Sequence, residues 1–204
     1  METLNWEITT GCGNLGGGCE SCPSLLEYQR KGWDYSIQLH ENRLTQPTKI
    51  KEPTVFTVSL GSDLFHESVP DEFIKRAFDV MNYVPEHTFE VITKRAERLV
   101  FIAKDLEWTP NISMGVTVES EKYKWRIDCL REVPAVVRFV SFLPVLGPVG
   151  KLNLDGIHIA GMGGEDWGLN RPCESAWLDE IERQCLEQGV EITSEFNMYS
   201  LQEN

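Results

Sequence analysis

Short apolar, β-branched segments alternate with helix-like segments along most of the chain, and this alternation constrains the fold more than any other feature. Seven segments have the length and composition of strands: residues 5–9, 55–59, 89–93, 113–118, 136–141, 156–160 and 190–194. Between them lie five segments with helical spacing: residues 24–30, 71–83, 96–106, 122–131 and 175–188. Because parallel strands need long crossover connections, usually helices, this alternation predicts a parallel sheet.

The segment 71–83 is the clearest helix. Its apolar residues fall on one helical face: Phe73, Ile74, Ala77, Phe78 and Met81. Ser68 precedes Pro70 and Asp71, a pattern typical of a capping box with proline in the first turn. Gly189 stands where the last helix should end.

The sequence therefore predicts one α/β domain over residues 1–204, built as a parallel (β/α)6-type partial barrel. The 204 residues include 41% hydrophobic residues, which suits one packed core, and no Pro/Gly/Ser-rich linker divides them. Six or seven units could close, or nearly close, into a barrel. An open doubly wound sheet is the alternative, because periodicity does not separate the two.

Three cysteines, Cys12, Cys19 and Cys22, lie in a glycine-rich loop at residues 11–23 with the spacing Cys-x6-Cys-x2-Cys. An iron–sulfur cluster or a structural zinc ion that is fully ligated by protein usually takes four ligands. Three thiolates suit a centre that leaves one metal position open. The alternative is a zinc loop that borrows a fourth ligand from elsewhere in the chain: His66, Cys129 or Cys173.

Polar residues follow the predicted strands. Because active sites gather at the carboxyl ends of parallel strands, we expect these residues to share one rim with the cysteine loop. They are Ser62, Asp63, Lys94, Arg95, Thr117, Glu119, Ser141, Gly163 and Glu165.

The net charge and the cysteine pattern limit the class of protein. A formal net charge of −13 argues against strong binding of duplex DNA. Two small basic clusters, Lys94-Arg95-Arg98 and Lys122-Lys124-Arg126, could contact one phosphate or a few, or form solvated helix faces. No signal peptide and no run of about 20 apolar residues is visible, so we expect a cytoplasmic protein with free thiols and no membrane contact.

Several motifs, in order along the chain, resemble a known group of proteins. They are ITTGC…GCxxC, SDLFHESVPDEFI, FEVITKRAERL, GVTVES, VRFVSFLPVLGPV and GGEDW…RP. The chain resembles the radical S-adenosylmethionine superfamily, and within it a phage and plasmid family of three-cysteine proteins. The superfamily's commonest spacing is Cys-x3-Cys-x2-Cys, whereas six residues separate the first two cysteines here.

The resemblance implies a site. Cys12, Cys19 and Cys22 would hold a [4Fe-4S] cluster whose unique iron chelates S-adenosylmethionine, and an external electron donor would reduce the cluster. Cleavage would give a 5′-deoxyadenosyl radical that abstracts hydrogen from the substrate. Cosubstrate contacts are implied for Ser62, Asp63, Thr117, Glu119, Ser141 and Gly163. Substrate contacts are implied for Lys94, Arg95 and Glu165.

Simpler structural roles stand beside these. Ser62 and Asp63 could form a helix cap or an Asx-turn, and Glu119 could pair with Lys94 or with Lys122. Lys94 and Arg95 could be a solvated helix start. The segment 163–165 could be a tight turn. No catalytic residue and no oligomeric state is assigned.

The resemblance also implies a function. We expect a radical enzyme that acts on a modified nucleotide or DNA base, isomerase-like, in phage DNA hypermodification. It would work in the cytoplasm of a phage-infected or plasmid-bearing bacterial host. One alternative is the same chemistry on a small metabolite or a protein. Another is a non-catalytic zinc-binding module that recruits a partner.

Overall fold

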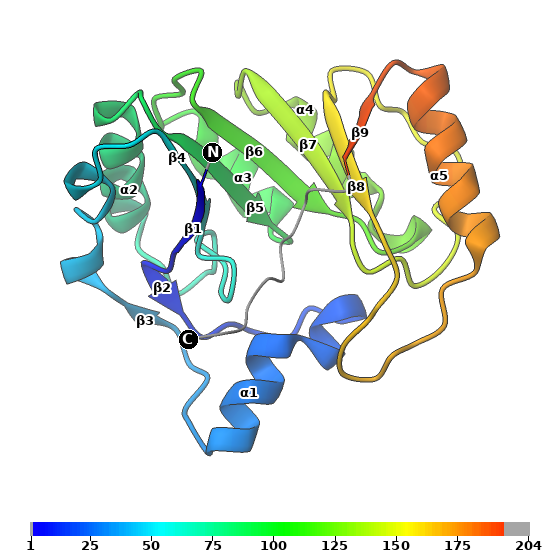
Figure 1. Ribbon diagram of the computed structural model, residues 1–204, viewed down its shortest axis with the longest axis horizontal. Coiled ribbons are helices and arrows are strands. Elements are labelled where there is room, and N and C mark those ends of the chain that lie inside the picture. The colour runs from blue at the N-terminus through cyan, green and yellow to red at the C-terminus, as the bar shows by residue number, and fades with distance from the viewer. Residues whose placement is uncertain (1, 194–204) are drawn as a thin grey trace.

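The computed structural model describes residues 2–193 and contains a seven-stranded sheet in the order β1-β4-β5-β6-β7-β8-β9. All neighbouring strands in it are parallel. The strands are β1 (Glu2–Trp6), β4 (Thr54–Val58), β5 (Thr88–Thr93), β6 (Ile112–Thr117), β7 (Val137–Phe142), β8 (Ile159–Met162) and β9 (Glu191–Thr193). The order of the strands in the sheet is their order along the chain, so each strand lies beside the one that precedes it in this sheet. The sheet curls into a half barrel (Figure 1).

Helices follow most of the strands and pack outside the curved sheet (Figure 1). They are α2 (Asp71–Tyr83), α3 (Ala96–Ala103), α4 (Trp125–Arg131) and α5 (Ser175–Glu187). Helix α1 (Pro23–Lys31) is different. Together with the loop before it, drawn in blue, it lies at the end of the sheet where the strands finish (Figure 1).

Short elements complete the chain. A small antiparallel pair joins β2 (Thr9–Thr10) to β3 (Gln38–Leu39). Four single 3-10 turns are η1 (Gly17–Ser21), η2 (Glu41–Arg43), η3 (Pro47–Lys49) and η4 (Glu121–Tyr123). Of these, η1 carries Cys19 and lies directly before α1.

The core lies between the sheet and the outer helices. Helix α2 buries the face predicted from its spacing: Phe73, Ile74, Ala77, Phe78 and Met81. Strand β6 is buried on both faces over most of its length, as expected for a central parallel strand. Gly115 in β6 lies opposite Phe139 of β7, and a Cβ atom there would stand 2.1 Å from that ring. The glycine therefore makes room for a large buried side chain.

The α/β partial barrel predicted from the sequence is confirmed, and the sequential strand order excludes the doubly wound alternative. Boundaries differ in several places. The first strand covers Glu2–Trp6 rather than residues 5–9, and the helix predicted at 96–106 ends at Ala103. The helix predicted at 122–131 is divided into η4 and α4. Residue 194, the last of the predicted strand 190–194, lies outside the described residues.

Of the two helix-end signals in the sequence, the one at Ser68 is wrong and the one at Gly189 is confirmed. Ser68 does not cap α2, because Pro70 is the N-cap and the Ser68 amide donates to Nδ1 of His66 at 3.1 Å. Gly189 does end α5: its φ is 71°, and the Val190 amide donates to the Cys185 carbonyl at 2.9 Å. That bond and the positive φ form the Schellman pattern, in which glycine is favoured.

Within residues 2–193, no helix combines the length and the apolar character needed to cross a membrane.

Candidate functional site

A pocket of about 80 Å³ lies at the carboxyl ends of the strands, and we call it the cysteine pocket. All three loop cysteines line it. So do predicted site residues from three strand ends: Ser62 and Asp63 after β4, Lys94 and Arg95 after β5, and Thr117 of β6. The parallel sheet thus brings together side chains that are far apart in the sequence, as the strand-end rule predicts.

The loop reaches this position through a glycine that no other residue could replace without rearrangement. Gly11 has φ 77°, and a Cβ atom there would lie 2.1 Å from the Ser36 carbonyl oxygen. The next amide, that of Cys12, donates to the Tyr35 carbonyl at 3.1 Å. This close approach fixes Cys12 against the segment that precedes β3. At the other end of the loop, Cys22 directly precedes α1, which begins at Pro23.

Asp63 and Arg95 form a buried ion pair beside Cys12. Arg95 Nη1 lies 2.9 Å from Asp63 Oδ2 and 3.5 Å from Cys12 Sγ. Asp63 also accepts bonds from the Thr93 hydroxyl and, at 2.9 Å, from the Phe65 amide, which is the Asx-turn considered above. Asp63 therefore holds Arg95 and the start of the following segment in place.

The Cys12 thiol is protonated at neutral pH. Burial raises its pKa to about 11, and the Asp63 carboxylate acts in the same direction, whereas Arg95 opposes both. Metal coordination deprotonates a thiol outright, so a bound metal would release this proton. The nearby guanidinium would then face a thiolate.

Tyr35 is a lining residue that sequence reasoning missed. Its hydroxyl lies 3.8 Å from Cys22 Sγ, and its ring packs against Tyr28 of α1 with centroids 5.0 Å apart. Burial holds the pKa of this phenol well above its usual range. It follows no strand and belongs to no motif, so its place in the pocket depends on the tertiary fold.

Glu119 connects the cysteine loop to the sheet. Its side chain is 1% exposed. It accepts bonds from Gly18 N at 3.3 Å, Lys94 Nζ at 2.6 Å and Arg126 Nη1 at 3.0 Å. Between the two partners considered from the sequence, Glu119 pairs with Lys94. The ion pair therefore fixes both the loop backbone and a lysine of the cysteine pocket.

Glu165 and Arg171 make a second contact to the cysteine loop, through Ser21 and Gly17. We call the group Glu165, Arg171 and Ser21 the Arg171 clamp. Arg171 lies 2.7 Å and 3.0 Å from the two Glu165 oxygens, and it donates to Ser21 Oγ at 2.8 Å and to the Gly17 carbonyl at 3.2 Å. Ser21 also donates directly to Glu165. Although burial acts to raise the pKa of Glu165, these hydrogen bonds lower it to about 2. The carboxylate is thus ionised and committed to holding η1.

The remaining predicted residues lie outside the lining of the cysteine pocket. Ser141 pairs with Thr117 in the β6–β7 register and is fully buried, and within residues 2–193 its hydroxyl has no hydrogen-bond partner. Gly163 bonds through its backbone to Phe142 and Val145. Glu119 and Glu165 act on the loop rather than line the pocket.

The residues considered as a fourth zinc ligand, His66, Cys129 and Cys173, do not line the cysteine pocket. Over the described part of the chain, no three His, Cys, Asp or Glu side chains form a group that could hold a metal ion. All six cysteines lie in this part and are free, as expected.

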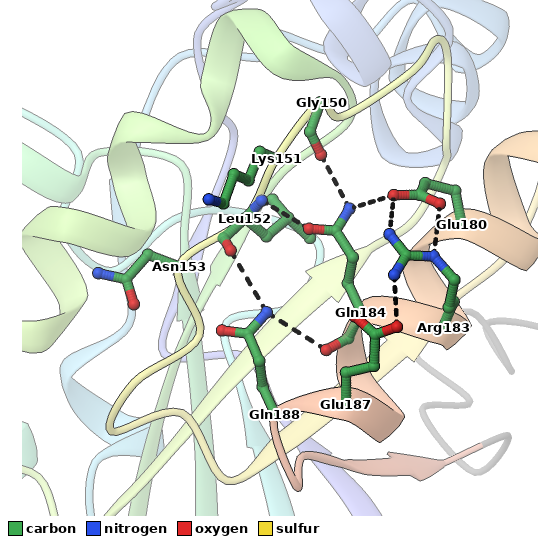
Figure 2. A pocket seen from close by; sticks show the side chains of 9 residues that line it. All are labelled: Gly150, Lys151, Leu152, Asn153, Glu180, Arg183, Gln184, Glu187 and Gln188. Atoms are coloured by element: carbon green, nitrogen blue, oxygen red, sulfur yellow. Dashed lines mark hydrogen bonds and ion pairs between the residues drawn. The ribbon is translucent and has the colours of Figure 1, made fainter.

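A second hollow, of about 980 Å³, shares no lining residue with the cysteine pocket (Figure 2). Its polar side chains largely satisfy one another or the backbone. Gln184 bonds to Leu152 N at 2.7 Å and to Gly150 O at 2.9 Å, and Arg183 pairs with Glu180 and Glu187 (Figure 2). The Gln184 bonds attach α5 to the loop before β8, and the Arg183 ion pairs lie within α5, so both have a structural role.

Together, fold and site define an α/β half-barrel protein with three free thiols in a pocket at the carboxyl ends of its strands. Residues 2–196 match the family described as "Protein of unknown function (DUF5131)", and the chain belongs to that family. No curated protein and no solved structure matches the chain.

This finding corrects the family assignment made from the motifs. The family that the chain matches is DUF5131, so the assignment to the radical S-adenosylmethionine superfamily is wrong. A physical reason lies in the motifs themselves. A glycine-rich cysteine loop after a first strand meets the needs of any bulky metal centre at a sheet edge, and unrelated families can share such a solution.

Proposed function

We propose that Cys12, Cys19 and Cys22 hold a four-iron, four-sulfur cluster with one open iron, in an enzyme that cleaves S-adenosylmethionine and acts on a nucleotide or nucleic-acid base. One observation carries the proposal: three free thiols, and none of the other three cysteines, border one pocket at the carboxyl edge of a parallel sheet. When bound, such a cluster supplies one electron, drawn from an external donor, for the reductive cleavage of a sulfonium cosubstrate.

The donors around the pocket suit this group in kind. Thiolates are the usual protein ligands of iron–sulfur clusters, and three of them leave one iron for a cosubstrate. Arg95 lies 3.5 Å from Cys12 Sγ and would offset the negative charge of a thiolate-bound cluster. Lys94 also lines this pocket, and its ammonium group donates to the Glu119 carboxylate.

Space is the feature that must change on binding. The pocket holds about 80 Å³, whereas one water takes about 30 Å³ of the liquid. A cluster therefore requires the loop at residues 11–22 to move outward. Gly16 and Gly17, with φ of 80° and 59°, supply a backbone that can change its path there.

Side chains in and near the cysteine pocket would bind and shield the reactants. Ser141 carries a buried hydroxyl without a partner among the described residues, next to Thr117, and such a group marks a place for a ligand's polar atom. Tyr35 lines the pocket beside Cys22, and its ring, packed against Tyr28, would help to exclude water.

An isomerase-like reaction involves a single substrate and therefore suits a small domain of 204 residues. The substrate would give one hydrogen atom to the 5′-deoxyadenosyl radical and, after rearrangement, regain one from the 5′-deoxyadenosine so formed, so that no net oxidant is needed. Free thiols and an oxygen-sensitive cluster fit the reducing cytoplasm of a bacterial host, which is the location we propose.

The test is reconstitution without oxygen, with iron and sulfide, followed by reduction and assay of 5′-deoxyadenosine from S-adenosylmethionine. Cys129 of α4, which lies outside the pocket, provides the matched control. We expect about four irons per chain and product formation in the native protein and in Cys129→Ala, and loss of both in Cys19→Ala. Uptake of zinc alone, with no 5′-deoxyadenosine, would instead indicate a non-catalytic metal-binding module.

A further inference from the structure

Two basic clusters that lie apart in the sequence meet in one surface pocket of about 340 Å³, which we call the basic pocket. Lys94, Arg95 and Arg98 come from the end of β5 and the start of α3, and Lys122 and Arg126 come from η4 and α4. The volume lies at the lower end of the range for small-molecule sites. The pocket is therefore a candidate binding site built by the packing of α3 beside α4.

Cationic side chains gather in the basic pocket, although the chain carries a formal net charge of −13. Five of them line it beside two carboxylates, Glu67 and Glu97, but four already pair with carboxylates: Lys94 and Arg126 with Glu119, Arg95 with Asp63, and Arg98 with Asp71. Lys122 forms no ion pair among residues 2–193, and its ammonium group lies 5.2 Å from the centre of the Tyr123 ring. An anion bound here would meet a cation that has no competing carboxylate.

Two arginines of the pocket each have a buried Nε atom without a partner among residues 2–193, although the Arg98 side chain as a whole is 22% exposed. Arg126 is 3% exposed, and neither its Nε nor that of Arg98 has a hydrogen-bond partner within the described residues. Buried N–H groups without partners are uncommon in folded proteins, and each needs an explanation. An anionic ligand in the pocket that reached these Nε atoms would supply the missing acceptors.

Aromatic rings stand among these cations. Trp125 is 40% exposed, and the Arg126 guanidinium lies 5.9 Å from the centre of its ring and 4.4 Å from that of Tyr123. An exposed indole beside arginine is a platform on which a flat ring stacks. A ligand that combines a planar ring with a phosphate would use both features.

We propose that the basic pocket binds one nucleotide, with its phosphate on Lys122 and Arg98 and its base on Trp125. Lys94 and Arg95 line both this pocket and the cysteine pocket, so the nucleotide lies next to the cysteine loop. The inference deepens the function proposed above and rests on it for the role of the nucleotide as substrate. The acidic balance of the remaining surface favours a single nucleotide unit, free or at the end of a strand, over a long strand.

Binding is measured by calorimetric titration of the full-length protein, before and after cluster reconstitution. The probes are the four deoxynucleoside 5′-monophosphates, the matching nucleosides, inorganic phosphate and a thymidine 20-mer. We expect the monophosphates to bind at least tenfold more tightly than either the nucleosides or phosphate. A 20-mer no tighter than the monophosphate supports the single unit, whereas a much tighter 20-mer with steep salt dependence overturns it in favour of a strand.

Two pairs of variants locate the binding. Lys122→Ala should weaken monophosphate binding about tenfold, whereas Lys124→Ala should change it less than twofold, because Lys124 pairs with Glu121 at 2.7 Å and does not line the pocket. Trp125→Leu should weaken binding about 5- to 100-fold, with retention in Trp125→Phe. Trp33→Leu, at another exposed tryptophan, should have no effect.

Equal losses in the paired variants, or no saturable binding of any monophosphate, would overturn the proposal. The two proposals fail separately. Nucleotide binding by a protein that forms no 5′-deoxyadenosine contradicts the cluster chemistry and leaves the basic pocket supported. Formation of 5′-deoxyadenosine by a protein that binds no nucleotide supports the cluster chemistry and contradicts the basic pocket as a nucleotide site.

Discussion

At the scale of single residues, Glu7 is an acid next to the cysteine pocket with a strongly raised pKa. Its carboxylate accepts a bond from the Gly61 amide at 3.1 Å, and Gly61 lines the pocket. Burial raises the pKa of Glu7 to about 7, although hydrogen bonds from Gly61 and Leu60 and the charge of Arg43 oppose the shift. The residue therefore changes its charge within the physiological range of pH.

This shift has a defined sign for stability. The ordinary pKa of the group, 4.5, describes the unfolded chain, and the folded value is higher. As the pH rises from 4.5 to about 7, the unfolded state loses the proton first, so the free energy of unfolding falls; above 7 the loss is constant. Glu7→Gln cannot ionise and should be more stable than the native protein at pH 8 by about 1–3 kcal/mol.

Urea unfolding at pH 5 and pH 8 measures this difference, and we expect little gain at pH 5. Glu86, which is exposed, provides the control, and Glu86→Gln should change stability equally little at both values of pH. A gain from Glu7→Gln that is the same at pH 5 and pH 8 would contradict the raised pKa.

At the scale of elements, the Arg171 clamp fixes η1 through the long connection between β8 and α5. Glu165 is fully buried at its side chain and Arg171 supplies its counter-charge, so Arg171→Ala would leave a buried carboxylate without a cation. We expect a loss of about 3 kcal/mol in the free energy of unfolding. We also expect faster hydrogen exchange at amides 17–22, because the Gly17 carbonyl and the Ser21 hydroxyl lose a partner.

Arg183 is the matched control, since it makes two ion pairs on the exposed surface of α5. Its replacement by alanine should change the free energy of unfolding little, because exposed ion pairs contribute little, and should leave exchange at the cysteine loop unchanged. Similar exchange rates at amides 17–22 in both variants would show that the clamp does not hold the loop.

The elements differ in how far the sequence predicts them. Helix α2 is predicted to the residue because five apolar side chains mark one face without interruption. The break between η4 and α4 is missed, because Tyr123, Ile127 and Leu130 keep an apolar face through the change from 3-10 to α geometry. β2 and β3 have two residues each, too few to show any period.

At the scale of the whole molecule, the parallel sheet explains which parts of the site are predictable. Ser62, Lys94 and Thr117 meet the cysteines because each follows or ends a strand, and the rule of strand ends needs no tertiary information. The bond between Arg171 and Ser21 spans 150 residues and joins the connection between β8 and α5 to the short turn η1. No local pattern encodes such a contact, and the same holds for the meeting of the two basic clusters.

Charge at this largest scale leads to a last prediction. With a formal net charge of −13, the molecule repels a polyanion, and the basic pocket gathers only five of its 19 Lys and Arg side chains. We therefore expect no measurable binding of a 20-base-pair duplex at about 150 mM salt, because duplex binding needs many neutralised phosphates. Fluorescence anisotropy with labelled duplex, from about 50 to 200 mM salt, measures this. Micromolar binding that falls steeply with salt would show that a basic face for duplex DNA forms despite the acidic balance.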